Sequence, residues 1–141
     1  MPAVSYDSVE VGTELPAGQY RVGRGDLIRY AGASGDFNPI HWNERIARSV
    51  GLPNVIAHGM YTMALAGRTL TDWTGDPGSV REFGVRFTKP VPVPDDDAGA
   101  EVVVTARVTQ KLDDRRVRVD LVATCAGEKV LGQARAVVAL P

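Results

Sequence analysis

The sequence predicts an α+β domain in which an antiparallel sheet wraps around one long apolar helix. Two observations lead to this prediction. Helical patterns occupy the first half of the chain and alternating strand patterns occupy the second half, a segregation that is typical of α+β folds. In addition, residues 59–74 form the only segment that is apolar enough, at helical spacing, to cover one face of a sheet. The length of 141 residues fits a single domain over 1–141.

Three helices are expected in the first half of the chain. An apolar stripe at helical spacing predicts the first helix from residue 24, with Gly35 as its stop. Asn43 is placed to cap a short second helix over 44–50. The third helix, over 59–74, is apolar nearly all round, and we therefore expect it to be buried.

The second half of the chain has the period of two that is typical of strands. Apolar and polar residues alternate over 82–87, 101–108, 116–125 and 130–140, and a short strand is expected earlier, over 19–22. The connections between the later strands have hairpin length, which predicts an antiparallel sheet. Such a sheet has one apolar face that needs a cover, and the helix over 59–74 supplies it. This arrangement describes a hot-dog fold.

The composition excludes several functional classes. The formal net charge is −1, and the chain carries neither the basic excess typical of nucleic-acid binding nor a polybasic run suited to anionic membranes. The single cysteine, Cys125, cannot form an intramolecular disulfide, which favours a reducing, cytoplasmic location. We find no signal peptide pattern and no apolar run long enough to span a membrane.

The stretch SGDFNPIH, residues 34–41, places an acid and a histidine five residues apart around a proline. Histidine is suited to proton transfer near neutral pH, and an aspartate beside it could share the same water molecule. A short segment fixed by Pro39 could direct Asp36 and His41 to one side. The alternative for Asp36 alone is an Asx-turn between two helices.

Gly59 opens the apolar helix directly after His58. The first N–H groups of a helix are free and the helix dipole favours negative charge there, while glycine permits close approach of a ligand. For His58 we expect a structural role in orienting the turn at Gly59, with a ligand or second-base role as alternatives. The two histidines lie 17 residues apart without a recognisable third ligand, so we expect no metal site.

The segment from Tyr30 to Met60 resembles the hydratase-2 motif of MaoC-like dehydratases, the (R)-specific enoyl-thioester hydratases. The resemblance is strongest to the mycobacterial (3R)-hydroxyacyl-carrier-protein dehydratase B-type subunits. It implies reversible hydration of a trans-2-enoyl thioester, carried on coenzyme A or acyl carrier protein, with no further cofactor. It also implies acid–base roles for Asp36 and His41, an oxyanion-donor role for the Gly59 N–H, and an orienting role in the substrate site for Asn38.

The resemblance also bears on the acyl tunnel. It implies that part of the apolar stripe of the central helix, including Met60 and Met63, contacts the acyl chain. Gly67 stands where some bacterial hydratases carry a serine. Any role of that hydroxyl is absent here, and the width of the pocket is expected to differ.

An unpaired edge strand is expected to drive pairing with a second hot-dog subunit. The resemblance leaves two forms open: a homodimer, or a heterodimer whose partner lacks the acid–histidine pair. A non-catalytic acyl-thioester-binding or partner-stabilising subunit is the alternative function, and the retained Asp36 and His41 speak against it. A hot-dog thioesterase would need an acid beside the thioester carbonyl, but on the central helix the first acid is Asp72, near the far end.

Overall fold

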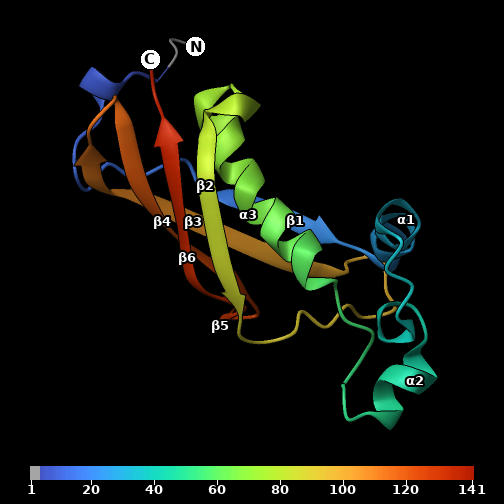
Figure 1. Ribbon diagram of the computed structural model, residues 1–141. Helices are drawn as coiled ribbons and strands as arrows, with labels where there is room; N and C mark the ends of the chain where they lie inside the picture. The colour runs from blue at the N-terminus through green and yellow to red at the C-terminus, as the bar shows by residue number, and fades with distance from the viewer. Residues whose placement is uncertain (1–3) are drawn as a thin grey trace.

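A computed structural model describes residues 4–141, so residues 1–3 of the predicted domain lie outside the described part (Figure 1). In residues 4–141 the strands are β1 (Gly18–Val22), β2 (Val80–Phe87), β3 (Ala100–Leu112), β4 (Arg116–Cys125), β5 (Glu128–Lys129) and β6 (Leu131–Ala139). They form one sheet in the order β1-β3-β4-β6-β2, and β5 pairs with β4. Every pairing is antiparallel, as predicted.

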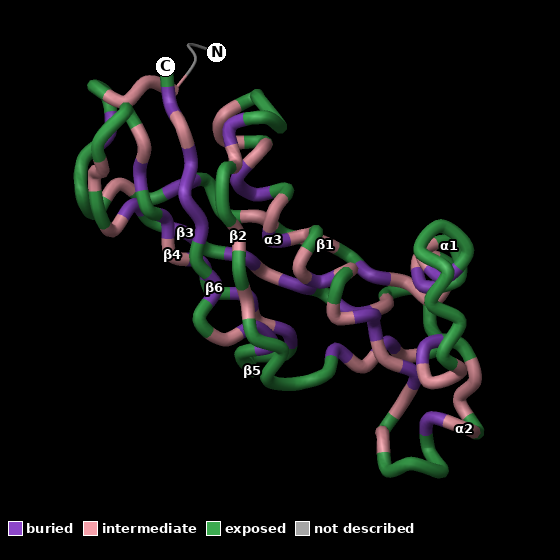
Figure 2. The backbone as a smooth tube through the Cα atoms, viewed as in Figure 1, coloured by how far each residue is buried: buried purple, intermediate pink, exposed green. Residues whose placement is uncertain are grey.

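The central strands carry the hydrophobic core. Along β3 and β4 the residues that face α3 are buried while their neighbours are more exposed, which confirms the predicted alternation (Figure 2). Val104 and Val119 are fully buried, and Cys125 lies on the same apolar side. The period of two therefore identified the core face of both strands.

The last strand, β6, matches the predicted segment over 130–140 to within one residue at each end, and a short additional strand, β5, precedes it. Ala126 and Gly127 have positive φ angles of 51° and 78°, so the chain turns tightly and β5 pairs with the end of β4. The strand pairing is interrupted at Val130, and β6 begins at Leu131. Near the start of β6, Gln133 has a φ of 46°, a left-handed conformation that strand propensity does not indicate.

The short helices lie where the local capping signals place them. α1 (Arg24–Ser34) ends at Gly35, whose φ of 78° is left-handed and whose N–H donates to Ala31. α2 (Glu44–Ser49) begins after Asn43, whose side chain accepts a hydrogen bond from the N–H of Ile46. Short 3₁₀ turns occur at η1 (Tyr6–Ser8), η2 (Pro39–His41) and η3 (Pro77–Ser79).

The long helix α3 (Gly59–Thr74) covers the sheet as predicted, but it is not buried on all sides. Its buried residues are Thr62, Ala66, Thr69 and Leu70, which follow helical spacing along one face. Met60 is 56% exposed on another face. The prediction of a helix buried all round is therefore wrong for the single chain, because one sheet can cover only one face.

The site-bearing segments and the two ends of the described chain lie at opposite ends of the molecule. α1 and α2 lie together near the start of α3, whereas the segments that hold Tyr6 and Pro141 lie near its end (Figure 1). The N–H of Tyr6 donates to the carbonyl of Pro141 over 2.9 Å. Within residues 4–141, none of the helices has the length and apolar character that crossing a membrane requires.

The packing of α3 predicts how two substitutions on it affect stability. Leu70→Ala should lower the free energy of unfolding by about 2–5 kcal/mol, because Leu70 is fully buried against the sheet. Met60→Ala, on the exposed face, should change it by no more than about 0.5 kcal/mol. Urea unfolding at matched protein concentration measures both, and equal losses would contradict this packing.

Candidate active site

The backbone between α1 and α2 is held in shape by its own side chains. Asp36 Oδ1 accepts the N–H of Asn38 over 3.1 Å, and Asn38 Oδ1 accepts the N–H of Ile40 over 3.2 Å. Pro39 then begins η2, where a fixed φ suits the first position. On the outside of the turn, the indole N–H of Trp42 donates to the carbonyl of Phe37 over 2.9 Å. The Asx-turn that was the alternative role for Asp36 is therefore present, and it occupies one carboxylate oxygen while the other stays available.

His41 is anchored to the segment that leads into α3. Its Nδ1 lies 2.7 Å from the carbonyl oxygen of Ile56. A carbonyl oxygen can only accept a hydrogen bond, so Nδ1 carries the proton and Nε2 of the neutral ring keeps its lone pair. The backbone joins the same two segments, since the N–H of Ile56 donates to the carbonyl of Ile40 over 3.1 Å.

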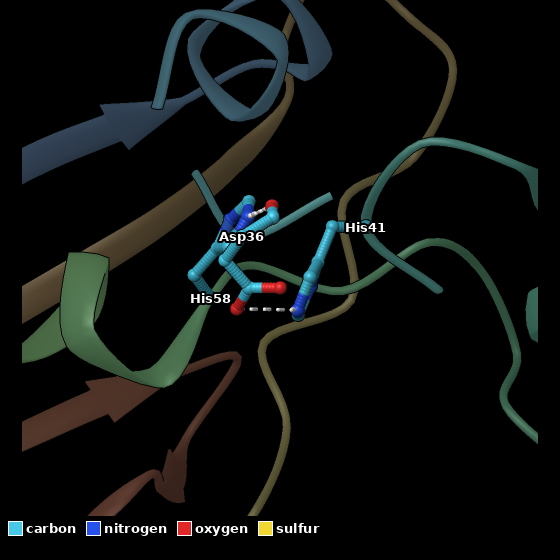
Figure 3. A group of neighbouring side chains, drawn as sticks. All are labelled: Asp36, His41 and His58. Atoms are coloured by element: carbon cyan, nitrogen blue, oxygen red, sulfur yellow. Dashed lines mark hydrogen bonds and ion pairs between the residues drawn. The ribbon is translucent and has the colours of Figure 1, made fainter. Parts of the chain in front are cut away.

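The free nitrogen of His41 faces the second carboxylate oxygen of Asp36. His41 Nε2 and Asp36 Oδ2 are 3.8 Å apart (Figure 3). This is too long for a direct hydrogen bond, but one water molecule could donate a hydrogen bond to each of the two acceptor atoms at once. The His41 side chain is 8% exposed and that of Asp36 is 52% exposed, so the pair combines a buried imidazole with a solvated carboxylate.

The surroundings of His41 favour its neutral form. Burial lowers the pKa of His41 below its usual value, and the nearby ring of His58 lowers it further. The hydrogen bond to Ile56 and the charge of Asp36 act in the opposite direction, with smaller total effect. A neutral His41 with a lone pair on Nε2 is the form that can accept a proton from water.

Gly59 begins α3 beside this pair. The N–H groups of Tyr61 and Thr62 donate to the carbonyl of His58, whereas the N–H of Gly59 has no acceptor within residues 4–141. It is thus a free donor at the positive end of the helix dipole. A Cβ atom at Gly59 would lie 3.0 Å from the ring of Phe87 on β2, so only glycine leaves both the ring and the amide their present space.

A cavity of about 340 Å³ adjoins His41 and Gly59. Its lining also includes Thr62 of α3 and apolar or aliphatic parts of β2, the segment after it and β6: Phe87, Thr88, Lys89, Pro90, Val91, Val130 and Leu131. A mostly apolar cavity beside a polar pair is the usual form of a small-molecule site.

The structure does not place every predicted site residue on this cavity. Met60 and Met63 are not among its lining residues, because they lie on other faces of α3 than Thr62. Asn38 also lies outside the lining, with its side-chain oxygen engaged in the turn. Thr62 and Phe87 were not predicted. Thr62 follows Gly59 by three residues, a spacing that places both on one face of the helix and could have indicated Thr62. The alternating pattern predicts Phe87 only as a strand residue.

At Gly67, where the sequence lacks a serine found in some hydratases, the ring of Phe83 fills the adjacent space. A Cβ atom at Gly67 would lie 3.2 Å from that ring. The contact comes from β2, the strand that also supplies Phe87. Neither Gly67 nor Phe83 lines the cavity beside His41 and Gly59, so the expected difference in pocket width stays a prediction.

Asp36, His41 and His58 bring three potential metal-ligand atoms within 4.8 Å of one another. The two imidazoles are stacked, with centroids 3.8 Å apart and planes 22° apart. Nitrogen lone pairs lie in the ring planes, and two planes that are stacked and nearly parallel do not direct their lone pairs at one common point. His41 Nδ1 and His58 Nε2 also contact carbonyl oxygens. The arrangement favours hydrogen bonding over metal binding.

A sheet wrapped on one helix, with an acid–histidine pair beside the first free amide of that helix, defines a hot-dog domain equipped for acid–base chemistry. Residues 8–125 match the family model described as a MaoC-like domain, and the chain belongs to this family. Its fold class is therefore the predicted one.

Curated relatives have related names. The chain is 43% identical over 79 residues to 3-hydroxyacyl-thioester dehydratase X of Mycobacterium tuberculosis. The matched region covers 56% of this chain and 27% of that protein. It is 32% identical over 139 residues to 3-hydroxybutyryl-CoA dehydratase of Methylorubrum extorquens. Here the matched region covers 96% of this chain and 83% of that protein. The chain thus spans about a quarter of the first relative's length and most of the second's.

Solved structures agree with the fold. A MaoC-like dehydratase superposes with a TM-score of 0.94 at 41% identity, over 99% of this chain and 43% of that one. The R-hydratase PhaJ1 from Pseudomonas aeruginosa superposes with a TM-score of 0.85 at 29% identity, over 99% and 86%. The ChsH1-ChsH2 complex from Mycobacterium tuberculosis superposes at 0.80 and 21% identity, over 94% and 98%, a likeness of fold alone.

The surroundings of His41 predict its titration. NMR titration of the His41 ring should give a midpoint below 6.5, because burial disfavours the imidazolium. Asp36→Asn should lower the midpoint further, since the carboxylate favours the charged ring. Asp72→Asn, on the exposed far part of α3, should leave it unchanged. A midpoint at or above 6.5 in the unaltered protein would contradict the burial effect.

Proposed function

We propose that the protein catalyses the reversible addition of water to a trans-2-enoyl thioester, giving the (R)-3-hydroxyacyl thioester. The observation that carries this proposal is the juxtaposition of His41 Nε2, Asp36 Oδ2 and the free N–H of Gly59 around one cavity. The names of the family and of its relatives support the same reaction.

Water is activated between the two side chains. His41 Nε2 accepts one proton of the water, and the oxygen attacks C3 of the enoyl group. Asp36 Oδ2 accepts the other hydrogen as a hydrogen bond and thereby orients the water. The imidazolium then returns its proton to C2, so the elements of water are added and His41 is regenerated. The reverse sequence gives dehydration.

Negative charge builds on the thioester oxygen as C3 is attacked. The N–H of Gly59, at the start of α3, is the group proposed to stabilise it, and the helix dipole acts in the same direction. The apolar lining of the adjoining cavity, including Phe87 and Leu131, suits the acyl chain. Lys89 at the same cavity forms an exposed ion pair with Glu128, and a phosphate of coenzyme A or of an acyl carrier protein would have to compete with that carboxylate for it.

We further propose that the protein acts in fatty-acid metabolism as part of a pair of hot-dog domains. β2 is an edge strand of the sheet, and two large apolar side chains are exposed, Phe87 at the end of β2 and Met60 in the first turn of α3, which suits pairing with a second subunit. A second copy or a different hot-dog subunit could fill this place. The fold likeness to a two-component complex supports pairing in general.

The thioesterase alternative has no support in the geometry. Asp72 lies thirteen positions after Gly59 on α3, which separates the two by about 20 Å along the helix axis. Asp72 instead forms an exposed ion pair with Arg68. A carboxylate at that distance cannot act on a carbonyl held at Gly59.

Removing either member of the acid–base pair should abolish most hydration. With crotonyl-CoA as substrate, Asp36→Asn and His41→Gln should each lower kcat/KM by about 10²–10⁴-fold, measured as loss of the enoyl-thioester absorbance. Asp72→Asn is the matched control and should retain full activity.

Each other outcome of this assay has a defined meaning. Full activity in both variants would overturn the catalytic assignment. Release of free thiol without hydration would identify a thioesterase. A chain that is inert alone but active with a second hot-dog subunit would support the heterodimer.

The proposed oxyanion donor can be removed without removing the helix. Gly59→Pro deletes the N–H at the first helical position, where proline is well tolerated, and the backbone of His58 (φ −58°, ψ 134°) suits a residue before proline. Gly59→Ala introduces the same crowding against Phe87 but keeps the N–H. We expect Gly59→Pro to reduce kcat about 10²–10³-fold below Gly59→Ala. Equal kcat values in two folded variants would exclude this donor.

A further inference from the structure

His58 contacts both members of the acid–base pair from inside the protein. It is 2% exposed and immediately precedes α3. Its ring stacks on that of His41, and its Nε2 lies 3.0 Å from the main-chain carbonyl oxygen of Asp36 (Figure 3). The edge of Tyr30 closes another side of the ring, with centroids 4.8 Å apart. The expected role at the Gly59 turn is not seen, since the side chain makes no capping hydrogen bond.

The direction of the Asp36 contact follows from the groups involved. A carbonyl oxygen can only accept, so His58 Nε2 carries the hydrogen and donates it. Nδ1 is then the lone-pair nitrogen of a neutral ring, and within residues 4–141 it is a buried side-chain atom without a hydrogen-bond partner. In the contact with Asp36, His58 is therefore the donor and the main-chain carbonyl is the acceptor.

We infer that His58 is a positioning residue that holds Asp36 and His41 in register, by its hydrogen bond to one and its stacking on the other. The inference rests on the proposed function. Asp36 needs such support because its side chain is exposed and its segment is otherwise shaped by local turns. The contact spans 22 residues and ties this segment to the start of α3. The contacts of His58 thus link Asp36, His41 and the start of α3.

This role requires a hydrogen-bond donor at the place that Nε2 of His58 occupies. Glutamine places its amide nitrogen the same number of bonds from Cβ as Nε2 of histidine, so it can donate to the Asp36 carbonyl. Asparagine places its amide one bond closer and cannot reach. Phenylalanine keeps the stacking and fills the space but donates nothing. A residue that merely fills the core would tolerate phenylalanine best.

The test compares His58→Gln, His58→Phe and His58→Asn in the crotonyl-CoA assay, with folding checked by circular dichroism and thermal unfolding. We expect kcat to fall about 10²-fold in the phenylalanine and asparagine variants, with KM little changed, because a misplaced group of the site costs about this much. The glutamine variant should recover most of the loss. Wild-type kcat in His58→Phe, or equal losses in all three folded variants, would overturn the inference.

A second measurement separates this inference from the proposed function. Hydrogen exchange of the Asn38 and Ile40 amides, followed by NMR, reports the order of the turn without substrate. Exchange should accelerate in His58→Phe and His58→Asn, by up to about tenfold for one lost hydrogen bond, but not in His58→Gln. An unaltered protein that fails to hydrate crotonyl-CoA or other enoyl thioesters would refute the proposed function alone. Unchanged exchange in all variants would refute the positioning role of His58 and leave the proposed function intact.

Discussion

The hydrogen bond from His41 Nδ1 to the carbonyl of Ile56 is the interaction on which the site depends. It determines that Nε2 is the free nitrogen, and it joins the turn after α1 to the segment that enters α3. That segment is itself held by backbone bonds, from the N–H of Ala57 to Val91 and from the N–H of Val93 to Val55. The imidazole is therefore connected through the main chain to the helix start on one side and to the connection between β2 and β3 on the other. A shift of either would move the base relative to the donor at Gly59.

His41 and Asp36 have different electrostatic surroundings, because the first side chain is buried and the second is exposed. His41 sits behind the turn, where burial lowers its pKa and favours the neutral ring. Asp36 projects from the turn with one oxygen engaged by the N–H of Asn38 and the other directed toward His41. A solvated carboxylate needs no buried counter-charge, so the site can hold a charge without the cost of enclosing it. The donor at Gly59 is part of the backbone and adds no ionisable group. The candidate site thus combines one buried imidazole, one exposed carboxylate and one free backbone amide at a helix start.

The sequence was sufficient to predict those features that depend on local spacing. Alternation identified the core face of β4 down to Cys125, and the capping residues Gly35 and Asn43 marked the helix ends. The acid–histidine pair and Gly59 were identified from the motif and the helix start. What remained hidden depends on tertiary contacts. A main-chain acceptor such as Ile56 has no signature in residue type, the bond from His58 to Asp36 joins distant segments, and an evenly apolar α3 does not reveal which face meets the cavity. For the last reason the pattern predicts Met60 and Met63 at the acyl chain, whereas the residue of α3 that lines the cavity after Gly59 is Thr62.

The hydrogen bond between Tyr6 and Pro141 has a consequence for architecture beyond one domain. The segments that hold these two residues lie side by side near the end of α3, whereas α1 and α2 lie near its start (Figure 1). A polypeptide fused after Pro141 would therefore leave the fold at the end of α3 that lies away from α1 and α2, and away from the turn between them that carries the acid–histidine pair.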